Sequence, residues 1–256
     1  MINKLSRRIL LSVLGDEKYL RLVSSVFLKL YHAKLVKKKY PEMYLLGNFI
    51  KEGFTCIDIG ANVGYYSIPM AELSGKSGKV YSVEPIPLFR KILSANLKRY
   101  RSGDRVEIIP YALGDKDNET LTMGTPSVDG LIHFGYTKVL SEESKKIKSI
   151  YSVKSFTPET LFKDLHQLHF VKCDVEGYEN HVIPHFENII KKFRPVLQIE
   201  ICSDENRKLI FRMLEGLGYK AFYFGNEKLN PVEVNSVSQI EKCDFYFIPD
   251  NQNIKS

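Results

Sequence analysis

The chain has 256 residues, of which 44% are hydrophobic and 26% charged, which allows a sizeable core and excludes a disordered or collagen-like chain. No apolar run approaches the roughly 20 residues needed to span a bilayer. The first 50 residues contain ten Lys/Arg and three Asp/Glu and so carry the whole net charge of +7, which means that the overall basicity is no argument for a nucleic-acid partner.

Residues 1–50 are predicted to form a basic helical extension ahead of a domain at residues 51–256. Apolar residues recur there at helical spacing, as at Leu22, Val26 and Leu30. The first apolar run is short for a signal peptide and is followed at once by charges, so we expect a cytoplasmic protein. Two roles for the extension stay open. Its apolar face packs on the domain or on another subunit, or the segment lies on an anionic membrane surface, which would make the protein peripheral to a membrane.

From residue 54 onward, strand and helix patterns alternate, which predicts a doubly wound α/β domain with a mostly parallel, seven-stranded sheet and helices on both faces. Strands are expected at residues 55–59, 79–83, 106–110, 169–174, 195–200, 219–224 and 243–248. Helices are expected from the loop after the first strand to about residue 75, and at residues 87–99, 159–165, 180–192 and 206–217. Residues 116–156 interrupt this rhythm as an insertion, with short strands at 119–123 and 151–156 around a loop rich in Gly, Ser and Lys.

The strongest local signal is the sequence DIGANVG at residues 58–64, directly after the first strand. Gly60 and Gly64 allow a tight turn and a close approach of the backbone to a ligand, where the next helix begins with free N–H groups. Asp58 can accept hydrogen bonds from the loop amides or hold a cationic group of a ligand. The G-x-G-x-x-G spacing of a dinucleotide dehydrogenase is absent.

Two further signals lie at strand ends. Glu84 ends the second strand about 25 residues downstream, where an acidic side chain can accept both hydroxyls of a ribose. The sequence FVKCDVEGYE, at residues 170–179, places Asp174 and Glu176 at the end of the strand next to the first one, where open α/β sheets bind their ligands. Lys172 is costly inside such a strand unless it is paired, and strand alternation puts it on the same side as Asp174.

Together with YALGD at residues 111–115 and RPVLQIEI at residues 194–201, these motifs resemble the FkbM family of methyltransferases. The resemblance covers about residues 54–225. It implies a Rossmann-like class I methyltransferase fold, S-adenosylmethionine as methyl donor, and usually O-methylation, often of sugars. By that likeness, the residues that frame the methionine end of the donor are Asp58, Gly60, Asn62 and Gly64. Glu84 would hold the ribose, and the loop that contains Ala112 and Asp115 would lie along the adenine.

Methyl transfer to a hydroxyl group is helped by a general base near the acceptor. Asp174 is the first candidate, and Glu176 and Glu200 are the next, since Glu200 ends the fifth strand and should open on the same face. We expect residues 124–150 to form a mobile cover over the acceptor site. His133 lies in this cover and is a further candidate for contact with the substrate or for catalysis.

The sequence leaves other functions open. These are a nicotinamide oxidoreductase, a non-catalytic nucleotide-binding or scaffold protein, and a methyltransferase that acts on nucleic acid or protein. The favoured acceptor is a sugar hydroxyl in a glycan or glycolipid, and a nucleic-acid partner is not expected.

The cysteines predict neither a disulfide nor a metal site. All four lie in apolar, strand-like segments without CxxC spacing, at Cys56, Cys173, Cys202 and Cys243. Buried free thiols are the usual state of such residues. The histidine pairs of the chain are expected to serve packing or the surface, so no bound metal is predicted.

Overall fold

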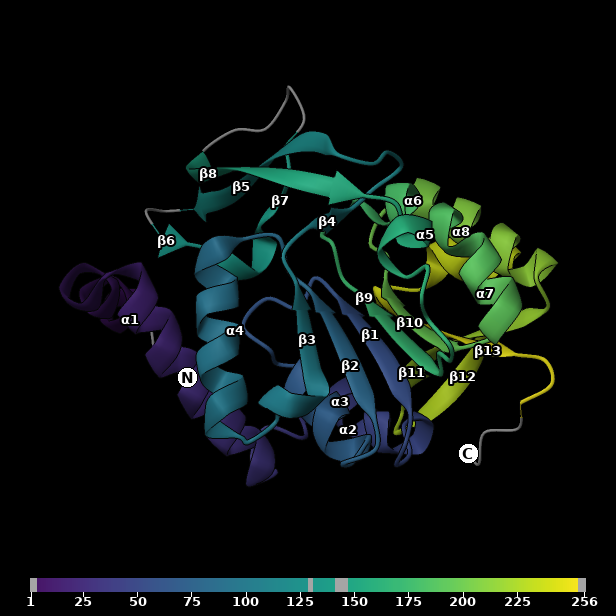
Figure 1. Ribbon diagram of the computed structural model, residues 1–256, viewed down its shortest axis with the longest axis horizontal. Coiled ribbons are helices and arrows are strands. Elements are labelled where there is room, and N and C mark those ends of the chain that lie inside the picture. Colours follow the sequence, from purple (N-terminus) through teal and green to yellow (C-terminus); the bar gives the residue numbers. More distant parts are fainter. Residues whose placement is uncertain (1–3, 129–130, 141–146, 253–256) are drawn as a thin grey trace.

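The strand before the glycine loop, β1 (Thr55–Ile59), is buried along its whole length in the computed structural model, which describes residues 4–128, 131–140 and 147–252. It lies inside a sheet with helices on both faces, the environment that a continuous apolar strand requires (Figure 1). Within the described ranges this sheet has eight strands, in the order β12 (Lys228–Val232), β11 (Tyr219–Gly225), β13 (Asp244–Pro249), β10 (Val196–Glu200), β9 (Phe170–Cys173), β1, β2 (Lys79–Val83) and β3 (Val106–Ile109).

The strand directions confirm the predicted α/β class. Strands β10, β9, β1, β2 and β3 are parallel, whereas β13 runs antiparallel to both of its neighbours. The sheet has one strand more than predicted, because β12 returns antiparallel to β11. The turn between them consists of Asn226 and Glu227, both in the left-handed region with φ of 52° and 61°. Two such residues make a tight hairpin turn, although the sequence lacks the Asn-Gly pair that usually announces one.

Helices cover both faces of the sheet. They are α1 (Lys4–His32), α2 (Pro41–Phe49), α3 (Ser67–Leu73), α4 (Pro87–Arg99), α5 (Pro158–Leu161), α6 (Glu179–Val182), α7 (Glu187–Phe193) and α8 (Asp204–Gly216), with 3-10 turns at Gly103–Arg105, Pro184–Phe186 and Val234–Gln239. Helices α6, α7 and α8 share one apolar cluster with Ile57 and Val171, and α2, α3 and α4 share another with Cys56 and Phe170. No helix of the described ranges is long and apolar enough to cross a membrane.

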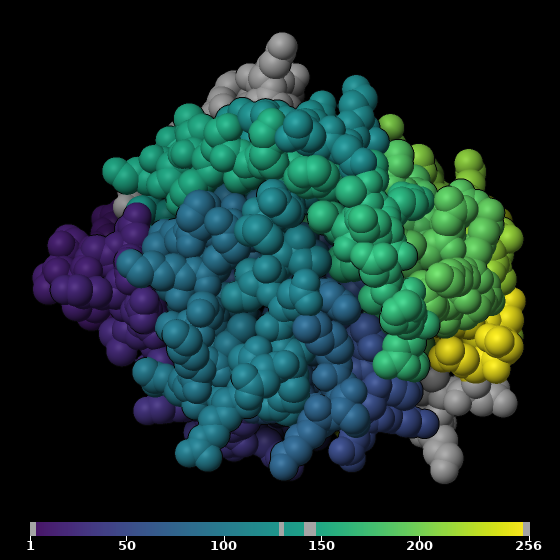
Figure 2. Space-filling view, viewed as in Figure 1, coloured from purple at the N-terminus to yellow at the C-terminus, as the bar shows by residue number. Residues whose placement is uncertain are grey.

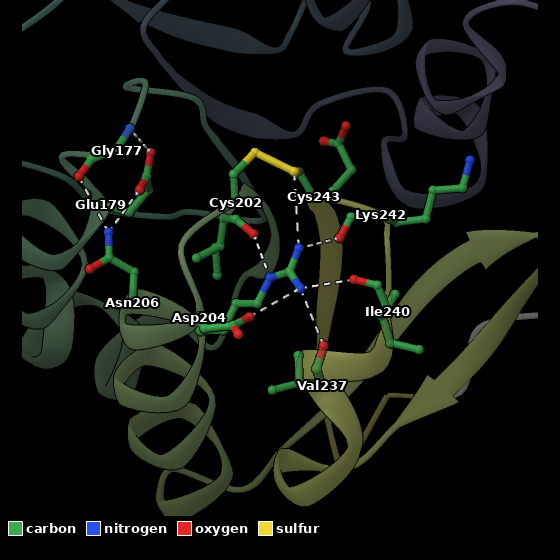
Figure 3. The surroundings of a disulfide bond; sticks show 12 residues. Gly177, Glu179, Cys202, Asp204, Asn206, Val237, Ile240, Lys242 and Cys243 are labelled. Atoms are coloured by element: carbon green, nitrogen blue, oxygen red, sulfur yellow. Dashed lines mark hydrogen bonds and ion pairs between the residues drawn. A yellow bond between two sulfur atoms is a disulfide. The ribbon is translucent and has the colours of Figure 1, made fainter.

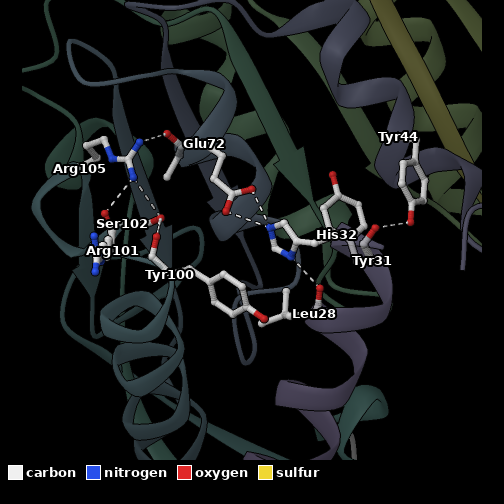
Figure 4. Close-up of polar contacts among 10 residues, drawn as sticks. Leu28, Tyr31, His32, Tyr44, Glu72, Tyr100, Arg101, Ser102 and Arg105 are labelled. Atoms are coloured by element: carbon white, nitrogen blue, oxygen red, sulfur yellow. Dashed lines mark hydrogen bonds and ion pairs between the residues drawn. The ribbon is translucent and has the colours of Figure 1, made fainter. Parts of the chain in front are cut away.

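The second half of α1 is built into this architecture. The helix breaks at Gly15, where φ is 70° and ψ is 169°, and farther along Leu28 is fully buried. At its end, the ring of His32 bonds the Leu28 carbonyl at 2.7 Å and lies 3.0 Å from both carboxylate oxygens of Glu72 in α3 (Figure 4). The same ring stacks on Tyr100 at 4.8 Å between ring centres. These contacts fix the end of α1 to the domain.

The insertion forms a second sheet above the first. Its strands are β4 (Ala112–Leu113), β5 (Glu119–Val128), β6 (Leu131–Ile132), β7 (Lys138–Val139) and β8 (Ile147–Phe156), with a 3-10 turn, η2, at Phe134–Tyr136. The predicted mobile loop is therefore largely regular structure, because β5 and β8 pair antiparallel far beyond the expected short strands. Burial alternates along β8, as it does in a strand with one solvent-exposed face. The lysine cluster around residue 145 lies outside the described residues.

The cysteine prediction is correct for Cys56 and Cys173 and wrong for the other two. Cys56 and Cys173 are free and buried, whereas Cys202 and Cys243 form a disulfide with Cα atoms 4.8 Å apart (Figure 3). The reason is the antiparallel return of β13 beside β10, which the sequence pattern does not reveal. The N–H of Ile201 donates to the Cys243 carbonyl, so both thiols lie at one end of this ladder. Disulfides are typical of oxidising compartments, which counts against the cytoplasmic expectation.

Candidate active site

A cavity of about 230 Å³ lies at the carboxyl ends of β1, β2 and β9, the edge where open α/β sheets bind their ligands. Its walls come from the glycine loop, the end of β2, the loop after β9 and parts of the insertion. The predicted site residues that line it are Asp58, Gly60, Asn62, Glu84, Ala112, Asp174 and Glu176. One cavity thus brings together most of the residues that the motifs singled out.

The glycine loop is fixed by backbone contacts to two neighbouring strands. The N–H groups of Gly60 and Ala61 both donate to the Val83 carbonyl at 3.0 Å. Gly60 has φ of +80°, and a Cβ on it would lie 1.8 Å from the carbonyl oxygen of Asp174. Only glycine fits there, because any side chain would collide with the backbone of the loop after β9.

The carboxylate of Glu84 is held by the backbone on both sides. Its Oε2 accepts from the Asn62 N–H at 2.8 Å, and its Oε1 accepts from the Ile86 N–H at 2.7 Å. Burial raises the pKa of Glu84 to about 8, although these two hydrogen bonds oppose the shift. Each carboxylate oxygen has two acceptor sites, so both oxygens keep capacity for hydroxyl groups of a ligand.

Asp58 belongs to a row of buried polar side chains on one face of the sheet. In strand register the row reads Ser82, Asp58, Lys172, Gln198 and Tyr246, from β2 to β13. All five residues are buried. Ser67, in α3, donates to the Asp58 carboxylate, and burial raises the pKa of Asp58 to about 6. Asp58 thus accepts hydrogen bonds from both the hydroxyl group and the backbone of Ser67, at the start of the following helix. That it holds a cationic group of a ligand stays a prediction.

Lys172 is the buried cation of this row. Its Nζ lies 3.6 Å from Asp174 Oδ2, 3.4 Å from Asp244 Oδ1 and 5.2 Å from the centre of the Tyr66 ring. Burial lowers the pKa of Lys172, but the two carboxylates outweigh it and hold the pKa well above its usual value. The sequence analysis missed Asp244, which starts β13 far along the chain and has no local motif.

Two further acids surround Asp174. Glu200, at the end of β10, shares a hydrogen bond with Asp174, and burial together with the Asp174 charge raises the pKa of Glu200 to about 8. Glu200 does not line the cavity. Burial and the charge of Asp174 also raise the pKa of Glu176 to about 7, and Glu176 does line the cavity. Its φ of 54° turns the chain sharply after β9.

The loop after β9 is held in place by hydrogen bonds of Glu179 and Asn206. Glu179 is 1% exposed and accepts from the Gly177 N–H at 2.8 Å (Figure 3). Asn206, from α8, donates to the Gly177 carbonyl and to Glu179, both at 3.3 Å. The second glutamate of DVEGYE thus holds the loop in place, whereas the first faces the cavity.

The insertion closes the cavity from above. Met123, Gly135, Thr137 and Val139 contribute to its walls, and Figure 2 shows the insertion as a continuous layer over this end of the domain. Of the charged side chains in the walls, four are acids, Asp58, Glu84, Asp174 and Glu176, and one is a base, Lys172. An acidic, covered cavity with a hydroxyl-binding carboxylate suits a nucleoside that carries a positive charge.

Besides Glu200, three more predicted residues do not line the cavity. His133 stacks on the exposed ring of Tyr136 at 5.7 Å and does not line the cavity, where Gly135 and Thr137 contribute instead. Its contact with an acceptor stays a prediction. Gly64 lets the glycine loop pack closely on α4, since a Cβ at Gly64 would lie 2.6 Å from a methyl group of Leu93. The carboxylate of Asp115 lies 3.6 Å from His181, outside the cavity.

Comparison with known proteins identifies the class of chemistry. Residues 58–221 match the family of the methyltransferase FkbM domain. Over 50 residues, the chain is 48% identical to a protein-L-isoaspartate O-methyltransferase of Methanococcoides burtonii, a match that spans 20% of this chain and 25% of that protein. The solved FkbM methyltransferase of Methylobacillus flagellatus is similar with a TM-score of 0.47 and 15% identity, over 78% of this chain and 44% of that one. Fibrillarin of Aeropyrum pernix, solved with bound S-adenosylmethionine, is similar with a TM-score of 0.46 and 13% identity, over 80% of this chain and 72% of that one.

Proposed function

The chain belongs to the family of FkbM-domain methyltransferases, enzymes that use S-adenosylmethionine as methyl donor, and we propose that its acceptor is a sugar hydroxyl in a glycan or glycolipid. When bound, the donor supplies a methyl group already activated by a sulfonium charge. The protein therefore has to align the reactants and remove one proton from the acceptor.

The backbone and the charges that border the cavity suit the donor. The close approach of Gly60 to the loop after β9 lets the backbone of the glycine loop border the cavity directly. Each carboxylate oxygen of Glu84 accepts one backbone hydrogen bond and can accept a second one. Glu84 would use these remaining positions to hold the ribose hydroxyls. The excess of acids in the walls, Asp58 and Asp174 among them, favours a sulfonium over a neutral group at the same place.

The observation that carries the proposal is the environment of Asp174. Its side chain is 31% exposed, lines the cavity, and has Lys172 as counter-charge and Glu200 as hydrogen-bond partner. The acceptor oxygen would bond to the methyl carbon while the methyl–sulfur bond breaks and S-adenosylhomocysteine leaves, and the acceptor proton would pass to the carboxylate of Asp174. Lys172 acts as a positioning residue, because its ion pair fixes the carboxylate of Asp174, and Asp244 in turn pairs with Lys172.

The charge of the walls also bears on the class of acceptor. Four acids around one lysine repel a phosphodiester backbone, whereas carboxylates bond the hydroxyl groups of a neutral polyol. The similarity to the isoaspartate methyltransferase spans a fifth of the chain and gives no evidence about the acceptor of this protein. A neutral polyhydroxyl acceptor is the class that the cavity favours.

The proposal is tested by methyl transfer from labelled S-adenosylmethionine into cell extract. Label should appear in material that resists nuclease and protease and that releases a methylated sugar on acid hydrolysis. Label in nucleic acid or protein would refute the sugar acceptor and leave the donor assignment intact. A chain that binds no S-adenosylhomocysteine would refute the donor assignment as well.

A further inference from the structure

The first turns of α1 carry a row of exposed apolar side chains. Leu5, Ile9 and Val13 are 67%, 54% and 75% exposed and lie four residues apart, so they form one stripe along the helix. Among the described residues, six of the ten exposed large apolar side chains belong to the first 35 residues. A stripe of this kind marks a surface that binds something.

The opposite face of the same turns is occupied. Leu10, Leu11 and Leu14 pack against the cluster that contains Phe89 and Phe134. The guanidinium of Arg7 donates to the carbonyl of Ile132 in β6. The stripe is therefore the outward face of a helix whose inward face is already docked, and Figure 2 shows these turns as a projection at the side of the molecule.

The charges beside the stripe identify its partner. Lys4 and Arg8 form the neighbouring i, i+4 row, and residues 4–14 contain three basic residues and no acid. Residues 51–256 are neutral overall, so the net positive charge of the chain belongs to the N-terminal segment that carries the stripe. A second copy of the chain would bring the same basic segment to a symmetric interface, where like charges repel.

We propose that residues 4–14 bind the surface of an anionic phospholipid membrane, with Leu5, Ile9 and Val13 in the interface and Lys4 and Arg8 at the headgroups. Through Arg7 and β6 the stripe is joined to the part of the insertion that lines the cavity. On the proposed function, the acceptor is then the sugar of a glycolipid held at that surface.

The test is co-sedimentation of the full chain with vesicles, without donor or acceptor. Vesicles of phosphatidylcholine with about 30 mol% phosphatidylserine should bind the chain at about 50 mM salt, and binding should be lost at about 500 mM because the charges are screened. Pure phosphatidylcholine should bind at least about tenfold less. A chain that ignores the anionic vesicles at low salt overturns the proposal.

Variants locate the binding surface. Leu5→Ser with Ile9→Ser and Val13→Ser should weaken vesicle binding about tenfold or more, while the exposed Leu209→Ser leaves it unchanged. Lys4→Gln with Arg8→Gln should weaken it by on the order of tenfold, and Lys208→Gln with Lys220→Gln should not. Binding that survives both variants of residues 4–14 overturns the proposal. So does a dimer in sedimentation velocity that the stripe variant abolishes, without any vesicle binding.

This test is independent of the proposed function. Each variant is also titrated with S-adenosylhomocysteine, whose affinity should stay the same, because none of the changed residues lines the cavity. Loss of vesicle binding with normal donor binding concerns only the membrane surface. Failure of donor binding in the unmodified chain would refute the methyltransferase assignment and leave the vesicle result as it stands.

Discussion

A Cβ atom on Gly60 would lie 1.8 Å from the carbonyl oxygen of Asp174, so the glycine loop and the loop of the proposed base are in backbone contact. Gly60→Ala should therefore displace both loops and weaken S-adenosylhomocysteine at least tenfold by calorimetry. Gly53→Ala is the control, because Gly53 has a similar φ of +84° and its Cβ would meet only a serine oxygen at 3.6 Å. Both variants should lose about 1–2 kcal/mol of stability to backbone strain. Equal donor affinity in both would show that the contact between the loops does not matter for binding.

The carboxylates at the ends of β1 and β2 should contribute to donor affinity. At about pH 9, where both acids are ionised, Asp58→Ala and Glu84→Ala should each weaken S-adenosylhomocysteine by about tenfold or more, since a lost hydrogen bond to a charged group costs roughly 1.5–3 kcal/mol. Glu107→Ala serves as a control, because this acid is exposed and pairs only with Lys79 on the surface. Unchanged affinity in folded Asp58→Ala and Glu84→Ala proteins would remove both residues from the donor site.

The buried acids should make the free chain less stable at high pH. The pKa values of Asp58, Glu176, Glu84 and Glu200 are raised to about 6, 7, 8 and 8. In the unfolded chain these groups titrate near 4–4.5, so between about pH 4.5 and 8 the folded state holds more protons and stability falls as pH rises. The melting temperature should drop from about pH 5 to about pH 9, by about 2–4 °C for each kcal/mol lost.

Donor binding and one substitution check the cause of that slope. The rise in melting temperature produced by S-adenosylmethionine should grow with pH, because ionised acids attract its sulfonium charge. Glu176→Gln should flatten part of the slope near pH 7, since the amide does not titrate. A melting temperature that is independent of pH, or an unchanged slope in Glu176→Gln, would contradict the raised pKa of Glu176.

The disulfide should stabilise the end of the sheet that carries Glu200 and Asp244. Reduction, or Cys202→Ser with Cys243→Ser, should cost about 2–4 kcal/mol, as expected for a bond that closes a loop of 41 residues. Denaturant unfolding measures the loss, and free-thiol titration should count two thiols in the oxidised chain and four in the reduced one. Four reactive thiols in the unreduced, unfolded chain would show that the bond does not form.

The sequence was sufficient to predict the parts of the fold and of the site that depend on local residue patterns. The strands at the centre of the sheet and the cavity residues Asp58, Glu84 and Asp174 follow from apolar runs that end in acids at one edge of a parallel sheet. The residues it missed meet across long separations. Asp244 was missed because it meets Lys172 from 72 positions away, and the disulfide depends on the same antiparallel return of β13.

The insertion was predicted least well, for a physical reason. Strand β5 contains three Thr, one Ser and one Gly, and β8 contains three Ser and two Lys. Such compositions suit loops as well as a strand with one solvent-exposed face. Without the strand pairing, the sequence does not show which residues in and beside η2 face the cavity, so His133 was chosen although Gly135 and Thr137 line the wall.

The central claim is that this chain methylates a hydroxyl oxygen with Asp174 as base, and labelled methyl transfer into an extract tests it most directly. The label should survive mild alkali, as a methyl ether does and a methyl ester does not. Asp174→Asn should bind S-adenosylhomocysteine as well as the unmodified chain does and lose on the order of 10²–10⁴-fold in transfer. Label released by alkali would contradict the hydroxyl acceptor, and near-normal transfer by Asp174→Asn would contradict the assigned base.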